Sequence, residues 1–178
     1  MSILPRSGLL PETHLVPDLL APDLKLVFCG TALGRKSAEA RAYYANPTNL
    51  FWRALHEAGL TPRRLPPADY AQLLDHGIGL TDLAKHHFGN DAELPGDALD
   101  RTTLRDKIMH YRPAILAFTS KAGASITLGR PTGRIPLGEQ AERIGGTRLF
   151  VLPSPSGSAR RYWDIAVWRD LAELVWDL

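Results

Sequence analysis

Short apolar runs alternate with amphipathic stretches along most of this chain, and the two patterns predict strands and helices respectively. The runs that are almost continuously apolar, as is typical of strands covered on both faces of a parallel sheet, are residues 24–29, 114–118 and 149–152. Helices are predicted after Ser120 and over residues 47–58, 67–75, 98–111 and 159–176. A short strand or turn is expected at 78–83, and a hairpin or long loop at 130–146. This order predicts a three-layer α/β fold with a central, mainly parallel sheet.

The length fits one domain, which we expect over residues 24–178. The 178 residues are 44% hydrophobic, which is enough to fill a single core. Residues 1–23 hold four of the fourteen prolines, so we expect an extended arm there. Neither a signal peptide nor a run of about 18 apolar residues is visible. We therefore expect a cytoplasmic protein without a membrane partner, and a monomer.

Positive charge is concentrated in one segment. Between Arg101 and Trp163, eleven Lys and Arg stand against three acidic residues, a local net charge of +8, whereas the whole chain carries +2. Such an asymmetry indicates a surface for a polyanion, and a solvated basic face is the simpler alternative.

No metal or cofactor is expected from the residue types present. The single cysteine, Cys29, lies inside the first predicted strand, so we expect an inert core residue and neither a disulfide nor a cysteine-ligated metal. His86 and His87 are adjacent, but neighbouring side chains point apart on a helix or strand, and no third ligand stands at a helical spacing.

The first predicted strand leads into a loop that resembles a ligand site. Gly30 and Gly34 allow a sharp turn and a close approach of backbone to a ligand. Asn46 and Pro47 then read as the cap and first position of a helix, which places Asn49 in the first turn. The adjacent Tyr43 and Tyr44 offer flat aromatic surface, which suits a planar heterocycle.

A second loop follows the strand at 149–152 and reads Pro153-Ser-Pro-Ser-Gly-Ser-Ala-Arg-Arg161. Ser158 is placed to cap the last helix, and Ser156 reads as part of a capping turn rather than as a nucleophile. Both loops lie at carboxyl ends of parallel strands, where open α/β sheets bind ligands. Phosphate-binding, dinucleotide-binding and nucleophile-elbow motifs are missing from the sequence. An aromatic pocket beside a rigid turn with two arginines would fit a flipped base and its backbone.

Three segments carry a resemblance to a known family. Val27-Phe-Cys-Gly-Thr-Ala-Leu-Gly34, Tyr44-Ala-Asn-Pro-Thr-Asn-Leu-Phe-Trp52 and Leu152-Pro-Ser-Pro-Ser-Gly-Ser-Ala-Arg160 resemble, in order and spacing, motifs of the uracil-DNA glycosylase superfamily. The nearest branch is that of the mismatch-specific uracil and thymine-DNA glycosylases, whose motifs read G-I-N-P-G and N-P-S-G. The resemblance spans residues 24–178 and implies a parallel sheet between helices.

By position, the resemblance implies a role for each loop. Tyr44 would stack on the flipped base, and Gly30, Thr31, Ala32 and Gly34 would line its pocket. The DNA-binding loop would comprise Ser154, Pro155, Ser156, Gly157, Ser158, Arg160 and Arg161, with Ser158 and Arg160 at the intercalating and base-reading positions. Ala32 stands where the family has its catalytic asparagine, and Ser154 also replaces an asparagine.

The implied function is a monofunctional DNA glycosylase that excises uracil, and other deaminated bases, by hydrolysis. Since alanine cannot hold water through a hydrogen bond, another residue would position the attacking water, and the candidates are Asn49, Asp82 and Ser37. Asn49 is favoured because an asparagine in a similar N-x-F-W context resembles the catalytic residue of the related hypoxanthine-DNA glycosylases. The alternatives are a non-catalytic protein that holds a flipped base or abasic site, and a nucleobase-binding protein unconnected with DNA.

Overall fold

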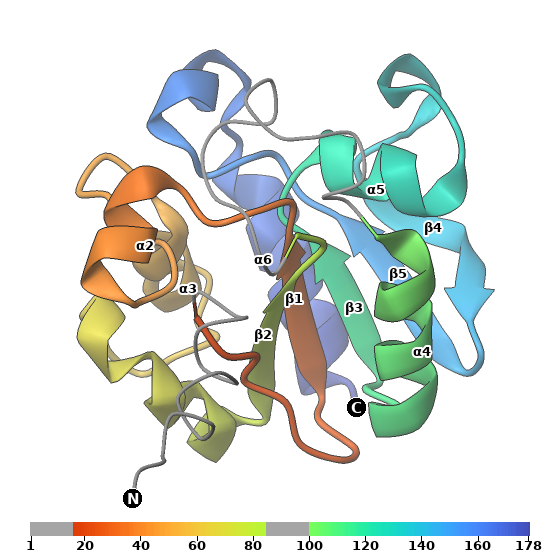
Figure 1. Ribbon diagram of the computed structural model, residues 1–178, viewed down its shortest axis with the longest axis horizontal. Coiled ribbons are helices and arrows are strands. Elements are labelled where there is room, and N and C mark those ends of the chain that lie inside the picture. The colour runs from red at the N-terminus through yellow and green to blue at the C-terminus, as the bar shows by residue number, and fades with distance from the viewer. Residues whose placement is uncertain (1–15, 85–99) are drawn as a thin grey trace, which may run out of the picture.

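The computed structural model describes residues 16–84 and 100–178. These residues form one five-stranded sheet and the helices around it (Figure 1). The strand order is β2-β1-β3-β5-β4. Four strands are parallel: β1 (Leu26–Gly30), β2 (Ile78–Asp82), β3 (Ile115–Phe118) and β5 (Thr147–Val151). The fifth, β4 (Gly138–Ile144), pairs antiparallel with β5 and forms the hairpin that was one of two predictions for residues 130–146.

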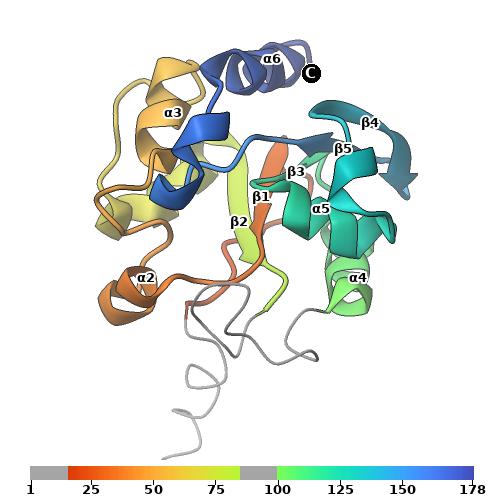
Figure 2. The ribbon, with the colours of Figure 1, turned by 90° about the horizontal axis from the view of Figure 1, so that it is seen from above.

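Helices cover both faces of the sheet, so the predicted three-layer α/β fold is confirmed (Figure 2). Side chains of β1 alternate between the layers: Leu26 and Phe28 belong to one core cluster, Val27 and Cys29 to the other. The first cluster packs against α3 (Phe51–Glu57), η1 (Pro67–His76) and α6 (Ile165–Trp176). The second packs against α4 (Arg101–Tyr111) and α5 (Lys121–Leu128). Because every residue of β1, β2 and β3 is buried, these strands show no polar face.

Three helix starts differ from the predictions. Helix α3 begins at Phe51 and not at Pro47, because the side chains of Asn46 and Asn49 bond nearby backbone amides and form turns instead. Helix α6 begins at Ile165 with Asp164 as its cap, so Ser158 does not cap it. Residues Gly157–Tyr162 form a separate 3-10 helix, η4, capped by Ser156. Helix α4 is capped by Asp100, and the residues before Asp100 in its predicted span lie outside the described part.

A short helix, α2 (Arg35–Ala40), was not predicted, and it follows directly on Gly34. The remaining short helix is η3 (Thr132–Arg134). Helix α5 does begin after Ser120, whose hydroxyl accepts a hydrogen bond from the Gly123 amide, as predicted. Within residues 16–84 and 100–178, no helix is both long and apolar enough to cross a membrane.

The chain segment before β1 is attached to the edge of the sheet. Val16 is fully buried, and Leu19 exchanges two backbone hydrogen bonds of 2.9 and 2.8 Å with Leu80 of the edge strand β2. The Asp18 carboxylate accepts a hydrogen bond from Thr81 and pairs with Lys107, each at 2.7 Å. These contacts cover an edge that would otherwise offer unpaired backbone groups.

Candidate functional site

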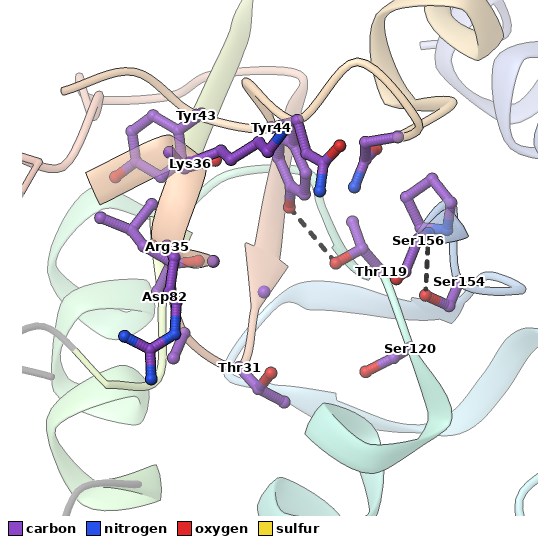
Figure 3. Close-up of a pocket in the computed structure, with 18 of the residues that line it drawn as sticks. Thr31, Arg35, Lys36, Tyr43, Tyr44, Asp82, Thr119, Ser120, Ser154 and Ser156 are labelled. Atoms are coloured by element: carbon purple, nitrogen blue, oxygen red, sulfur yellow. Dashed lines mark hydrogen bonds between the residues drawn. The ribbon is translucent and has the colours of Figure 1, made fainter. Parts of the chain in front are cut away.

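A cavity of about 660 Å³ lies at the carboxyl edge of the parallel strands (Figure 3). It forms there because β1, β2, β3 and β5 all end at this edge, so the residues that follow them meet. The predicted site residues that line it are Gly30, Thr31, Ala32, Gly34, Ser37, Tyr44, Asn49, Asp82, Ser154, Pro155, Ser156 and Ser158. The two loops singled out in the sequence therefore border one cavity.

The floor of this cavity is built around Gly30. Asp82, at the end of β2, is the register partner of Gly30 and is only 4% exposed. A side-chain Cβ on Gly30 would lie 2.6 Å from Oδ1 of Asp82, 3.3 Å from the Tyr44 hydroxyl and 3.7 Å from Oγ1 of Thr119. Glycine is therefore needed at this position because a carboxylate and two hydroxyls converge over its Cα. A Cβ on Gly34, in contrast, would meet nothing within 4 Å.

Tyr44 is held in place by three constraints. Its φ of 52° lies in the left-handed region, which is uncommon for a bulky residue and is found where surrounding contacts enforce it. Its ring stacks on Phe51 with centroids 3.9 Å apart and planes at 17°. Its hydroxyl lies 3.3 Å from Oγ1 of Thr119 (Figure 3). Phe51 thus covers one face of the ring, and Tyr44 lines the cavity.

Burial, reinforced by the nearby Asp82, raises the pKa of the Tyr44 phenol well above 10.0. The hydroxyl is therefore neutral at physiological pH and can donate a hydrogen bond to a ligand atom. Together with Thr119, it places two hydroxyl groups beside one buried carboxylate on the cavity floor.

Asn49 lies in a turn that precedes α3. The sequence had predicted it within the first turn of that helix. Its side-chain Oδ1 accepts a hydrogen bond of 2.9 Å from the Phe51 amide, and its own amide donates to the Asn46 carbonyl at 2.9 Å. Within the part of the chain that the structure describes, the side-chain Nδ2 of Asn49 makes no hydrogen bond. The fixed orientation and the spare donor let Asn49 hold a water or a ligand oxygen at the cavity wall.

The other candidate for the catalytic role, Ser37, is 5% exposed and lies in α2. Its hydroxyl accepts a hydrogen bond of 2.9 Å from the Ala45 amide, next to Tyr44. This bond holds the Tyr44 loop against α2. Ala32 lines the cavity but offers only a methyl group.

Sequence reasoning did not assign to the site several residues that line the cavity, namely Arg35, Lys36, Asn46, Thr119 and Ser120. Arg35 and Lys36 come from α2, whose sequence Arg35-Lys-Ser-Ala-Glu-Ala40 is rich in helix formers and could have indicated a helix. Thr119 and Ser120 follow β3 directly. Their position at the carboxyl end of a central strand is the signal that could have identified them.

The second loop is fastened to the first. The Leu50 amide donates to the Pro155 carbonyl at 2.8 Å, and the Arg160 guanidinium donates to the Thr48 carbonyl at 3.0 Å. Gly157 lies so close to Thr48 that a Cβ there would be 2.5 Å from the Thr48 hydroxyl. Ser154 and Ser156 bond amides within the loop itself. The rim of the cavity is thus a connected unit with Ser158, Arg160 and Arg161 exposed on it.

Among the residues that the structure describes, four of the eleven Lys and Arg of the basic segment form ion pairs. Lys107, Arg112, Arg130 and Arg148 form ion pairs with Asp18, Asp23, Glu142 and Glu139 respectively. Four cationic side chains lie at the cavity: Arg35 and Lys36 on its wall and Arg160 and Arg161 on its rim loop. Of these four residues, Arg160 and Arg161 belong to the segment that the sequence predicts as a surface for a polyanion, and Arg35 and Lys36 lie outside it.

Among the described residues, no group of three or more His, Cys, Asp and Glu could hold a metal ion. Cys29 is buried in β1, as expected. His86 and His87 lie outside the described residues.

Comparisons with known proteins agree with this architecture. The family model of the uracil DNA glycosylase superfamily matches residues 17–172. The chain is also similar to the solution NMR structure of a "putative Uracil DNA glycosylase" from Methanosarcina acetivorans, with a TM-score of 0.59. The two sequences are 23% identical, and the match covers 88% of this chain and 96% of that chain, which shows a shared fold. The family match spans most of the sequence and supports a glycosylase-type function. This chain belongs to the uracil DNA glycosylase superfamily.

Proposed function

We propose that this protein is a monofunctional DNA glycosylase that flips uracil out of DNA and hydrolyses its N-glycosidic bond, leaving an abasic site. We further propose that it acts inside the cell as a monomer. The observation that carries the proposal is the meeting of Tyr44, Asn49 and Asp82 in one cavity of about 660 Å³ within a fold of this family. Other deaminated bases would also fit a cavity of this volume.

The flipped base would stack on the face of Tyr44 that Phe51 does not cover and reach the floor above Gly30. Base–aromatic stacking contributes about 1–3 kcal/mol and tolerates different bases. The buried Asp82 carboxylate can accept a hydrogen bond from a ring N–H, and the Tyr44 hydroxyl can donate to a ring carbonyl instead of to Thr119, whose own hydroxyl donates to the Cys29 carbonyl. Donors placed where charge develops also stabilise the departing base anion.

Among the three candidates, Asn49 is the best placed to hold the attacking water. Its amide is oriented by the hydrogen bond to Phe51, and its Nδ2 is available on the cavity wall. Asp82 is more deeply buried and lies beside the base-binding groups. Its role would therefore be contact with the base or stabilisation of the positive charge that develops on the sugar. The Ser37 hydroxyl is committed to the Ala45 amide and supports the loop.

The rim loop would approach the duplex through Ser158, Arg160 and Arg161. These residues are exposed, and the connection of this loop to the Tyr44 loop would keep both at a fixed distance from the flipped nucleotide. If phosphate contacts dominate the binding, affinity for duplex DNA will be strong at about 50 mM salt and will fall steeply as the salt concentration rises.

The test is uracil release from duplex and single-stranded oligonucleotides under enzyme excess, with wild type, Asn49→Ala and Asp82→Asn. Gln72→Ala is the control for loss of a side-chain amide, because Gln72 is exposed on η1, does not line the cavity, and accepts a hydrogen bond from Arg63. We expect activity in the wild type and the control, and a loss of about 10²-fold or more in Asn49→Ala. Full activity in both Asn49→Ala and Asp82→Asn would refute the assignment of these residues.

The second candidate function, a protein that holds a damaged base or abasic site without cleavage, is favoured by Ala32, which lacks the amide of the family's catalytic asparagine. Tight binding of uracil-containing DNA with no base released would decide for it. If DNA is not bound at all at about 50 mM salt, a nucleobase-binding protein unconnected with DNA replaces both.

A further inference from the structure

A second cavity, of about 390 Å³, adjoins the first. The two cavities share Tyr44, Asn46 and Asn49, so the turn that contains these residues forms the wall between them. The far wall of the second cavity is residues 64–67, the loop that leads into η1, and Trp52 of α3 also lines it. None of the roles assigned above uses this cavity.

The lining of the second cavity combines rigid apolar surface with one charge. Pro47, Pro66 and Pro67 line it, and proline has an apolar ring, lacks a backbone N–H, and fixes the backbone locally. Among the described residues that line the cavity, Arg64 alone carries a charge. Its side chain is exposed and makes no hydrogen bond or ion pair within the described part of the chain. The neighbouring Arg63, in contrast, donates to Oε1 of Gln72 at 2.9 Å.

The wall that the two cavities share offers a path for a strand whose damaged nucleotide occupies the first cavity. The next nucleotide of that strand carries an apolar sugar face and an anionic phosphate, which match the proline rings and the guanidinium. Arginine is suited to phosphate because its planar fork donates two parallel hydrogen bonds. Proline rings need no rearrangement to contact a sugar.

We propose that the second cavity binds the nucleotide that flanks the damaged one on the same strand, with its phosphate on Arg64. This subsite rests on the proposed function, since it requires DNA in the first cavity. It would fix the position of the damaged strand independently of which base is excised.

The experiment measures binding to a duplex that carries a tetrahydrofuran abasic-site analogue, so that the result does not depend on base identity. In a series of such duplexes, a neutral methylphosphonate replaces one flanking phosphate at a time. For the wild type we expect one position at which neutralisation weakens binding about tenfold, as is typical for loss of a charge-assisted hydrogen bond. Arg64→Ala should weaken binding to the unmodified duplex by a similar factor and be insensitive to neutralisation at that position.

Arg64→Ala should also reduce the slope of log affinity against log salt by about 1. Arg63→Ala is the matched control, and it should keep the sensitivity of the wild type at that phosphate. Arg64→Gln provides a second variant that keeps most of the side-chain volume. If the wild type binds the duplex but Arg64→Ala and Arg64→Gln respond to every methylphosphonate as the wild type does, the subsite is refuted and the proposed function stands. If the wild type does not bind the duplex, both are refuted.

Discussion

Replacing Gly30 by alanine tests the convergence of side chains on the cavity floor. The added Cβ would lie 2.6 Å from Oδ1 of Asp82, well inside van der Waals contact, and 3.3 Å from the Tyr44 hydroxyl. Asp82 is 4% exposed and its backbone is fixed by the pairing of β1 with β2, so the carboxylate must rotate within the cavity to relieve this contact. Overpacking of this kind costs about 1–3 kcal/mol, which for a chain of this size lowers the Tm by roughly 2–12 °C.

The same displacement should reduce activity more than stability alone explains. A shift of about 1 Å in a positioned group can cost about 10²-fold in rate, so we expect single-turnover uracil release to fall by one to two decades in the folded variant. Gly34→Ala is the control, because its Cβ meets nothing within 4 Å and its φ of −72° suits any residue. The measurements are thermal unfolding and excision at a temperature where both variants are folded. If Gly30→Ala matches Gly34→Ala in both, the three groups do not converge as described.

Three further predictions concern the walls of the site. Tyr44→Ala should slow single-turnover excision by one to two decades through lost base stacking, whereas Tyr44→Phe, which keeps the ring, should slow it by less than about tenfold. Equal losses of rate in the two variants would show that the hydroxyl, and not the ring, is responsible. Arg160→Ala removes the hydrogen bond to the Thr48 carbonyl, so urea unfolding should show a loss of about 0.5–1.5 kcal/mol, together with weaker DNA binding; unchanged affinity would restrict the residue to a structural role. Burial raises the pKa of Tyr43 and Tyr44 in the folded protein, so the unfolded chain releases their protons at a lower pH, and the free energy of unfolding should fall as the pH rises above about 10. In unfolding experiments across that range, the double variant Tyr43→Phe, Tyr44→Phe should show a shallower fall of the free energy of unfolding.

The sheet and the place of the site were accessible from the sequence because they depend on simple patterns. Strands such as β1 and β3 are buried on both faces and therefore appear as short apolar runs. Once these strands are parallel, the residues that follow them must meet at one edge, which brings Gly30 and the loop at residues 153–161 together. The end of β2 at Asp82 follows from the same rule, although residues 78–83 were also compatible with a turn.

The details of the loops were not accessible, because they depend on competition between local hydrogen bonds. Asn46 and Pro47 are a good helix start in isolation, yet the Asn46 and Asn49 side chains bond amides two residues ahead and delay α3 to Phe51. Thr119 follows a predicted strand, but its hydrogen-bond distance to the Tyr44 hydroxyl, 75 residues away in the sequence, is not visible in any local pattern. The left-handed backbone of Tyr44 is likewise stabilised by partners far away in the sequence, such as Thr119, and no local pattern signals it.

The hydrogen bonds that connect the rim loop to the Tyr44 loop also limit how this protein can be altered. Thr48 fills the space that a side chain at position 157 would need, and its carbonyl accepts the bond from Arg160. A side chain at position 157 would therefore require a smaller residue at position 48, whereas Gly157 has no side chain that could be reduced to make room for a larger residue at position 48. Loop grafts from other superfamily members should succeed only when both segments, residues 44–50 and 153–162, are exchanged together. The pair behaves as one module for engineering, although about a hundred residues of sequence separate its halves.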